Sequence, residues 1–135
     1  MSDDACTITS RPDLGILVAR WNADAPPAQL RADYQAVLAT AKQNQLGRWL
    51  LDVRRRNNLD PEIGQWTTHE FYPEAATKLA PTPLRMAILC SPARLEVYKA
   101  TPEQEQYLTF GLAPERPYQM HLFIEEGPAM QWLLE

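Results

Sequence analysis

Two apolar segments constrain the fold of this 135-residue chain more than any other feature. The segment from Leu84 to Cys90 is apolar apart from Arg85, and the segment from Trp49 to Val53 is a second, shorter apolar run bounded by charge. Neither shows the strict alternation of apolar and polar residues that marks a half-exposed strand. Both therefore predict buried strands, and the longer one predicts an interior strand of a parallel sheet that is covered on both faces.

Helix-start signals lie between the predicted strands. Asp24 precedes Pro26 and Pro27, which predicts a cap followed by a first helical turn, and Gly47 is placed to end that helix. The apolar stripe of this helix consists of Leu30, Tyr34, Val37, Leu38 and Ala41. A second helix is predicted to open at Asp60-Pro61-Glu62, with Pro73 expected to break or kink it before helical character continues to Leu79.

Two more helices are predicted in the last third of the chain. Thr101-Pro102-Glu103-Gln104 resembles a capping box and predicts a helix with Tyr107, Leu108 and Leu112 on its buried side. Glu125-Glu126 and Pro128 predict the start of a final helix. The residues expected to face inward from it are Ala129, Met130, Trp132 and Leu133.

The remaining strands complete the predicted architecture. Residues 7–9 and Ile16 to Trp21 predict a hairpin around the turn that ends at Gly15, and Tyr118 to Ile124 predicts the last strand. Strands that alternate with helices imply right-handed crossovers. The sequence therefore predicts one α/β domain over residues 1–135, with a mixed, mostly parallel sheet, an N-terminal antiparallel hairpin and helices packed on it.

The end of the chain also carries a family resemblance. Phe123 to Leu133 contains a strand ending in an aromatic residue, an acidic pair, an alanine and then Trp-Leu. This order resembles the closing pattern of the SpoIIAA-like branch of the STAS superfamily, and Leu84 to Ile88 resembles its preceding interior strand. STAS domains occur in sulfate transporters and in anti-sigma-factor antagonists, so the resemblance implies a STAS-like fold and a regulatory or protein-interaction role.

The resemblance fails at the site of phosphorylation. Anti-sigma-factor antagonists carry a phosphorylatable serine after the central strand, whereas the stretch from Asp52 to Pro61 contains neither serine nor threonine. The phosphoswitch is therefore not carried over. The expected function is a non-enzymatic regulatory or protein-interaction domain, and the alternative is a module that binds a small anionic or amphipathic molecule.

The candidate ligand-binding residues follow the central strand. Arg54, Arg55 and Arg56, with Asn57, lie where open α/β sheets favour ligands, and guanidinium groups suit an anion. Trp66 on the next helix is included as an aromatic neighbour. The alternative is a solvated loop, because charged runs usually face water. Two carboxylates argue against an anion here, since Asp52 can neutralise one arginine and Asp60 would repel the ligand.

No catalytic, metal or cofactor site is expected. Cys90 ends a strand on the presumed ligand side, but a buried, inert thiol is the expectation. His69 lacks a second metal ligand one turn away, where Pro73 stands, and His121 is expected to pack or to lie at an edge.

The net charge and the composition limit the classes of partner that are expected. A net charge of −4 argues against nucleic acid, and the absence of an apolar run of roughly 20 residues argues against a membrane span. The acidic N-terminal residues lack a signal-peptide pattern, so a cytoplasmic protein is expected. The aromatic residues Trp66, Phe71 and Tyr72 exceed what one helical face needs, which predicts a homodimer.

Overall fold

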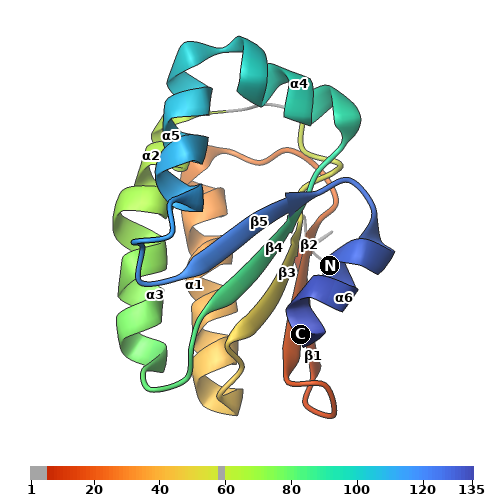
Figure 1. The fold of residues 1–135 in the computed structure, drawn as a ribbon, viewed down its shortest axis with the longest axis vertical. Coiled ribbons are helices and arrows are strands. Elements are labelled where there is room, and N and C mark those ends of the chain that lie inside the picture. Colours follow the sequence, from red (N-terminus) through yellow and green to blue (C-terminus); the bar gives the residue numbers. More distant parts are fainter. Residues whose placement is uncertain (1–5, 58–59) are drawn as a thin grey trace.

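The computed structural model contains five strands in one sheet, which follow one another in the order β1-β2-β3-β4-β5 (Figure 1). The structure describes residues 6–57 and 60–135, with residues 103 and 104 described by their backbone alone. The strands are β1 (Cys6–Arg11), β2 (Ile16–Trp21), β3 (Arg48–Asp52), β4 (Arg85–Leu89) and β5 (Gln119–Phe123). The helical segments are α1 (Pro27–Asn44), α2 (Pro61–Trp66), the π-helical turn η1 (Thr67–Phe71), α3 (Tyr72–Leu79), α4 (Pro92–Ala100), α5 (Pro102–Leu112) and α6 (Glu126–Leu134).

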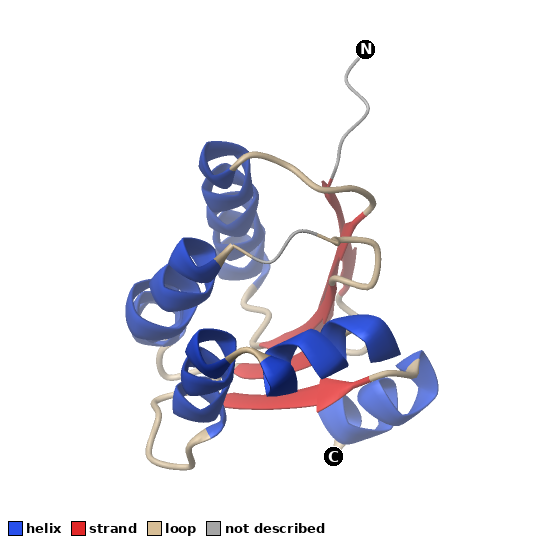
Figure 2. Ribbon diagram, turned by 90° about the horizontal axis from the view of Figure 1, so that it is seen from above, coloured by secondary structure: helices blue, strands red, loops and turns tan. Residues whose placement is uncertain are grey.

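The strand directions confirm the predicted fold class. β1 pairs with β2 in antiparallel fashion, and the β2-β3, β3-β4 and β4-β5 pairs are all parallel. Because each parallel strand is followed by its immediate neighbour, crossovers of one hand place the connecting helices on one face of the sheet. Figures 1 and 2 show α1, α2, α3 and α5 on that face, α6 on the opposite face, and α4 across the carboxyl ends of the strands.

The register explains why the central strands are apolar throughout. One row of side chains on the helix-covered face consists of Leu17, Trp49, Met86 and Met120, and the next consists of Ala19, Leu51, Ile88 and Leu122. On the opposite face a smaller cluster consists of Ile16, Leu50, Ala87 and Leu89 with Ala129 and Leu133 of α6. Both faces of β3 and β4 are therefore buried, as the two apolar segments predicted.

The boundaries of α1 differ from the sequence prediction at both ends. Its N-cap is Pro26, which makes no side-chain cap hydrogen bond, while Asp24 instead accepts the Asn57 backbone N–H at 2.8 Å. Gln45 ends the helix in the left-handed conformation, with φ of 54°. Gly47 is required for a different reason, because a Cβ there would lie 2.1 Å from the carbonyl oxygen of Pro83.

Pro73 does not end the second helical region. Asp60 caps it as predicted, by accepting the Glu62 backbone N–H at 2.9 Å. Helical structure then continues through η1 into α3, with Pro73 in the first turn of α3. The wider π-helical turn shifts the hydrogen-bond register just before the proline, so the missing N–H is accommodated within one continuous helical path.

The segment after β4 contains a helix that the sequence prediction missed. Ser91 caps α4 by accepting the Arg94 backbone N–H at 3.1 Å. The Thr101 half of the predicted capping box at the start of α5 is wrong, since Thr101 makes no side-chain cap hydrogen bond in the described structure. The side chain of its partner Gln104 lies outside the described residues. Leu112 is also exposed rather than buried, because it lies in the last turn of α5, where the chain leaves the sheet.

The inward stripe of α6 is narrower than predicted. Ala129 and Leu133 are fully buried, whereas Met130 and Trp132 are only partly buried. The Arg85 guanidinium lies 4.0 Å from the centre of the Trp132 ring, and the His121 ring lies 4.7 Å from it. Trp132 therefore covers the outer face of the sheet between two polar side chains and is not part of the core. Within the described ranges, no helix is long and apolar enough to cross a membrane.

Four charged residues tie α6 to the carboxyl ends of β2 and β3. Arg20 donates to Asp52 at 2.8 Å and to Glu126 at 2.8 and 3.1 Å, and Arg54 donates to Asp52 at 3.0 and 2.8 Å. Burial works to raise the pKa of Asp52, but hydrogen bonds from Arg54 and Arg20 outweigh it, so this pKa lies below its usual value. Hydrogen bonds from Arg20 likewise lower the pKa of Glu126.

Asp52→Asn should lower the free energy of unfolding by about 1–3 kcal/mol at neutral pH, because it weakens charge-assisted bonds to two arginines. Since both carboxyl pKa values are lowered on folding, this contribution is complete above the reference values of 3.8 and 4.5 and is lost as the pH falls below them. Urea unfolding at neutral pH and at about pH 3 measures both effects.

Asp13→Asn is the matched control, because Asp13 forms its ion pair with the exposed neighbour Arg11, so its replacement should change stability little. A loss for Asp52→Asn that is equally large at both pH values would contradict the role of this network.

Candidate ligand cavity

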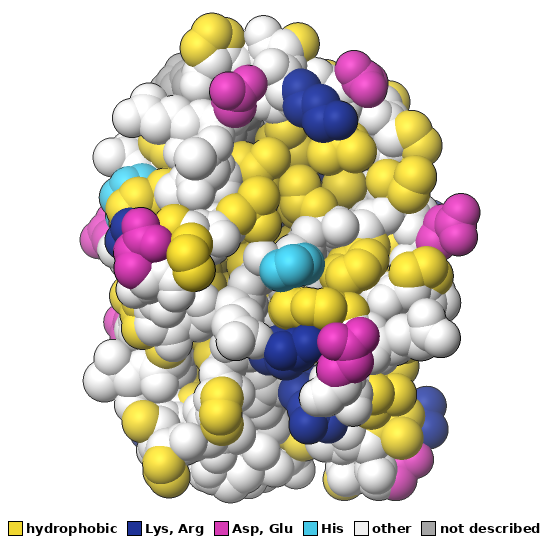
Figure 3. All heavy atoms as spheres, viewed as in Figure 1, with side chains coloured by type: hydrophobic (Ala, Val, Ile, Leu, Met, Phe, Trp, Pro, Cys, Tyr) yellow, Lys and Arg dark blue, Asp and Glu magenta, His cyan; other side chains and the backbone are white. Residues whose placement is uncertain are grey.

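A cavity of about 80 Å³ lies between the helix-covered face of the sheet and the helices α1, α2, α4 and α5. Its apolar wall is formed by residues of β3, β4, β5 and the adjoining helices: Leu51, Val53, Ile63, Ile88, Leu108, Met120 and Leu122. Figure 3 shows hydrophobic side chains gathered in a hollow, which lies among α4, α5 and β5 in the same view of Figure 1. The cavity therefore offers an apolar interior beside the carboxyl ends of the parallel strands.

Arg56 enters the cavity from the loop after β3. The Arg56 backbone N–H donates to the Val53 carbonyl at 3.1 Å, which closes a tight turn with Arg54 and Arg55 at its exposed tip. Arg56 itself points back into the protein and is only 3% exposed. Its hydrogen-bond acceptor is the Tyr34 hydroxyl at 3.4 Å, and its Nε has no hydrogen-bond partner among the described residues.

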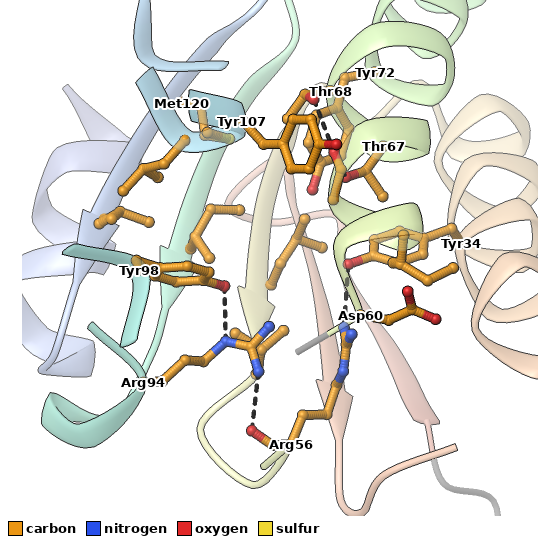
Figure 4. Close-up of a pocket in the computed structure, with 17 residues that line it drawn as sticks. Tyr34, Arg56, Asp60, Thr67, Thr68, Tyr72, Arg94, Tyr98, Tyr107 and Met120 are labelled. Carbon is orange, nitrogen blue, oxygen red and sulfur yellow. Dashed lines mark hydrogen bonds between the residues drawn. The ribbon is translucent and has the colours of Figure 1, made fainter. Parts of the chain in front are cut away.

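Arg94 enters the same end of the cavity from α4 and is 7% exposed. Its Nε donates to the Tyr98 hydroxyl at 2.8 Å, and its Nη1 donates to the backbone carbonyl of Arg56 at 2.9 Å. Figure 4 shows the Arg94 and Arg56 side chains side by side, approaching from opposite walls. Arg94 therefore joins α4 to the loop after β3 across the mouth of the site.

Neither buried guanidinium has a carboxylate counterion in the described part of the chain. Among the residues that the structure describes, no ion pair within 4 Å involves Arg56 or Arg94, although Arg54 in the same loop has two carboxylate neighbours. Asp60 also lines the cavity, and its carboxylate accepts the Glu62 backbone N–H. The cavity thus holds two positive charges and one negative charge, and an unpaired buried charge is costly unless something compensates it.

Hydroxyl groups lie at the other end of the cavity. Figure 4 shows Thr67, Thr68, Tyr72 and Tyr107 gathered there, away from the two arginines. Burial raises the pKa of Tyr72 well above its usual value, so this hydroxyl stays protonated at neutral pH. Burial also raises the pKa of Tyr98, although Arg94 partly offsets the effect. The Tyr72 and Tyr98 hydroxyls are therefore neutral, and they leave the positive charge of the arginines uncompensated.

The five residues that the sequence proposed for ligand binding do not lie together in the structure. Arg56 alone lines the cavity, while Arg54 is paired with Asp52 and Arg55 is exposed. Asn57 is exposed, and its backbone N–H donates to Asp24. Trp66 lies outside the cavity lining, with its ring 5.1 Å from that of Phe71 and below the Arg31 guanidinium.

The aromatic residues that prompted the homodimer prediction are largely internal. Phe71 and Tyr72 are buried, and Trp66 is half-buried against the core. The homodimer stays a prediction, but the aromatic surplus no longer supplies a reason for it.

Cys90 has the opposite of the properties that a nucleophile requires. Its side chain is fully buried, and burial raises the pKa of its thiol, so the reactive thiolate is disfavoured. The two histidines lie on the surface, with His69 stacked on Phe110 and His121 on Trp132.

Sequence reasoning missed Arg94, Tyr98, Tyr34 and Asp60 as cavity residues. Ser91-Pro92 is a cap followed by a proline, the same signal that located α2, and it predicts the helix that carries Arg94 and Tyr98.

Comparisons with protein-family models, curated proteins and solved structures found no match.

Replacement of Arg56 by methionine should leave the free energy of unfolding unchanged or raise it by on the order of 1 kcal/mol. The apolar side chain keeps much of the volume and removes a buried charge that lacks a counterion. Denaturant unfolding of the ligand-free protein measures the difference.

Arg54→Met is the matched control from the same loop. It should lower stability by on the order of 1 kcal/mol, because Asp52 loses a charge-assisted hydrogen-bond donor. A large loss of stability in Arg56→Met would identify Arg56 as a structural residue and contradict its assignment to a ligand site.

Proposed function

We propose that this protein is a small-molecule-binding module that holds an amphipathic anion. The acid group of the ligand binds Arg56 and Arg94, and its apolar part occupies the cavity between the sheet and α2, α4 and α5. The observation that carries this proposal is the pair of buried guanidiniums without a carboxylate partner among the described residues.

The distribution of arginines within one loop supports the proposal. Arg54 satisfies Asp52, and Arg55 faces solvent, so both have the ordinary positions of charged loop residues. Arg56 is instead buried with an unused Nε–H donor, which a carboxylate or phosphate oxygen would satisfy. Binding an anion there would offset the cost of burying the charge.

The lining of the cavity supports an amphipathic ligand over a simple inorganic ion. Apolar side chains of the sheet form the floor between the arginines and the hydroxyl groups. In a ligand with an acid group at one end, the acid group would pair with the arginines and the apolar part would contact the apolar floor. The regulatory role and the SpoIIAA-like resemblance expected from the sequence stay predictions, and ligand binding is compatible with both.

Isothermal titration calorimetry tests the proposal with a panel of amphipathic anions and uncharged analogues. The anions are butyrate, hexanoate, benzoate and phenyl phosphate, and the analogues are butanol, hexanol and benzyl alcohol. At least one anion should bind the wild-type protein at least tenfold more tightly than its analogue. Arg56→Met should weaken that binding at least tenfold, whereas Arg55→Met should leave it unchanged.

Equal affinity for the anion and its analogue would overturn the proposal, since the guanidiniums would then not contribute. The same conclusion would follow if Arg55→Met weakened binding as much as Arg56→Met did. Binding of none of the panel would also count against a ligand site at this cavity.

A further inference from the structure

The size of the cavity limits the apolar part of the ligand. Its volume is about 80 Å³. An engineered protein cavity of about 150 Å³ accepts benzene, so the inner space of this cleft, which opens to solvent in the hollow of Figure 3, has roughly half the volume of a cavity known to take an aromatic ring. Close-packed interiors resist expansion, because overfilling displaces neighbouring side chains at a cost in stability. A short aliphatic chain fits the inner space, whereas an aromatic ring would displace the lining or lie partly in the open mouth.

The charges of the cavity limit the acid group. Arg56 and Arg94 supply two positive charges, and Asp60 supplies one negative charge. A singly charged anion brings the cavity to neutrality, whereas a doubly charged phosphate would leave an excess negative charge in an apolar environment. Two planar guanidinium groups also match the planar geometry of a carboxylate, which accepts hydrogen bonds on both oxygens.

We infer that the ligand is a short-chain aliphatic monocarboxylate. This inference rests on the proposed function and narrows its ligand class. The carboxylate accepts hydrogen bonds from Arg94 and, once a small rotation of the Arg56 side chain exposes its buried Nε–H, from that donor as well. The alkyl chain lies along the floor that contains Leu51 and Ile88.

Binding would also fasten α4 to the rest of the protein. Arg94 lies on α4, and its side chain already reaches the Arg56 carbonyl across the cavity mouth. A carboxylate held by both guanidiniums adds a second connection between α4 and the loop after β3. The wild-type protein should therefore show slower amide hydrogen exchange in α4 when it is saturated with the ligand.

The test compares butyrate and isovalerate with benzoate and inorganic phosphate by calorimetry at equal ionic strength. The two aliphatic acids should bind the wild-type protein at least tenfold more tightly than benzoate, and phosphate should bind more weakly still. Butyramide, which has the same shape without the charge, should bind at least tenfold more weakly than butyrate.

Leu108→Ala provides a positive test of the size limit. Leu108 lines the cavity and is only half-buried, so its truncation enlarges the site with a modest effect on folding. This variant should gain affinity for benzoate at least fivefold and keep its affinity for butyrate within threefold. Circular dichroism confirms that the variant is folded before titration.

The outcomes separate this inference from the proposed function. Tight binding of benzoate or phenyl phosphate with weak binding of butyrate would overturn the aliphatic class and leave the anion-binding module in place. Binding of inorganic phosphate at least as tight as that of butyrate would overturn the monocarboxylate. A failure of every anion to bind would overturn both.

Discussion

The burial of the Arg56 guanidinium is the interaction that the rest of the site depends on. A charged side chain that is almost fully buried normally has a carboxylate partner, and Arg56 has none in the part of the chain that the structure describes. The Tyr34 hydroxyl and the Trp21 ring lie against it, and Arg94 donates to the backbone carbonyl of Arg56. The hydroxyl and the ring hold the guanidinium in place, but they do not neutralise it. The cavity beside it supplies the space in which an anion would do so.

The fold places Arg54 and Arg56, from one loop, on opposite sides of the sheet. β3 ends at the centre of the sheet, so the loop that follows it lies between the faces covered by α6 and by the other helices. Arg54 turns toward the α6 side and joins the network of Arg20, Asp52 and Glu126. Arg56 turns toward the opposite side and enters the cavity. Arg54 thus belongs to the charged network at α6, and Arg56, two positions later, belongs to the ligand site that we propose.

The sequence predicted the sheet well, because the apolar rows of β3 and β4 have no plausible place other than a doubly covered interior. It also located the loop after β3 as a candidate site. It did not distinguish Arg56 from Arg54 and Arg55, since their directions depend on the turn that the Arg56 backbone N–H closes with Val53. Asp60 was expected to repel an anion and Asp52 to neutralise an arginine, and the ion pair between Asp52 and Arg54 agrees with the second expectation.

The cavity itself was beyond sequence reasoning, because its lining residues are spread along the chain from α1 to β5. Arg94 and Tyr98 belong to α4, a helix whose apolar pattern is weak because it spans the strand ends instead of packing along the sheet. Tyr34 was predicted as a core residue of α1, and it is one, but its hydroxyl also reaches the cavity. Such a side chain both packs in the core and lines the cavity. The periodicity of the sequence predicts that it is buried, but not that it lines a cavity.

The NMR signal of the Arg56 Nε–H group, followed in ¹H–¹⁵N spectra while butyrate is added, tests most directly whether this buried charge binds an anion. In the free protein this proton lacks an acceptor, so formation of a hydrogen bond to a carboxylate should move its resonance downfield and slow its exchange with water. The Nε–H of Arg55, which is exposed, should not respond. An Arg56 signal that stays unchanged at saturating concentrations of every anion in the panel would contradict the assignment of this buried charge to ligand binding.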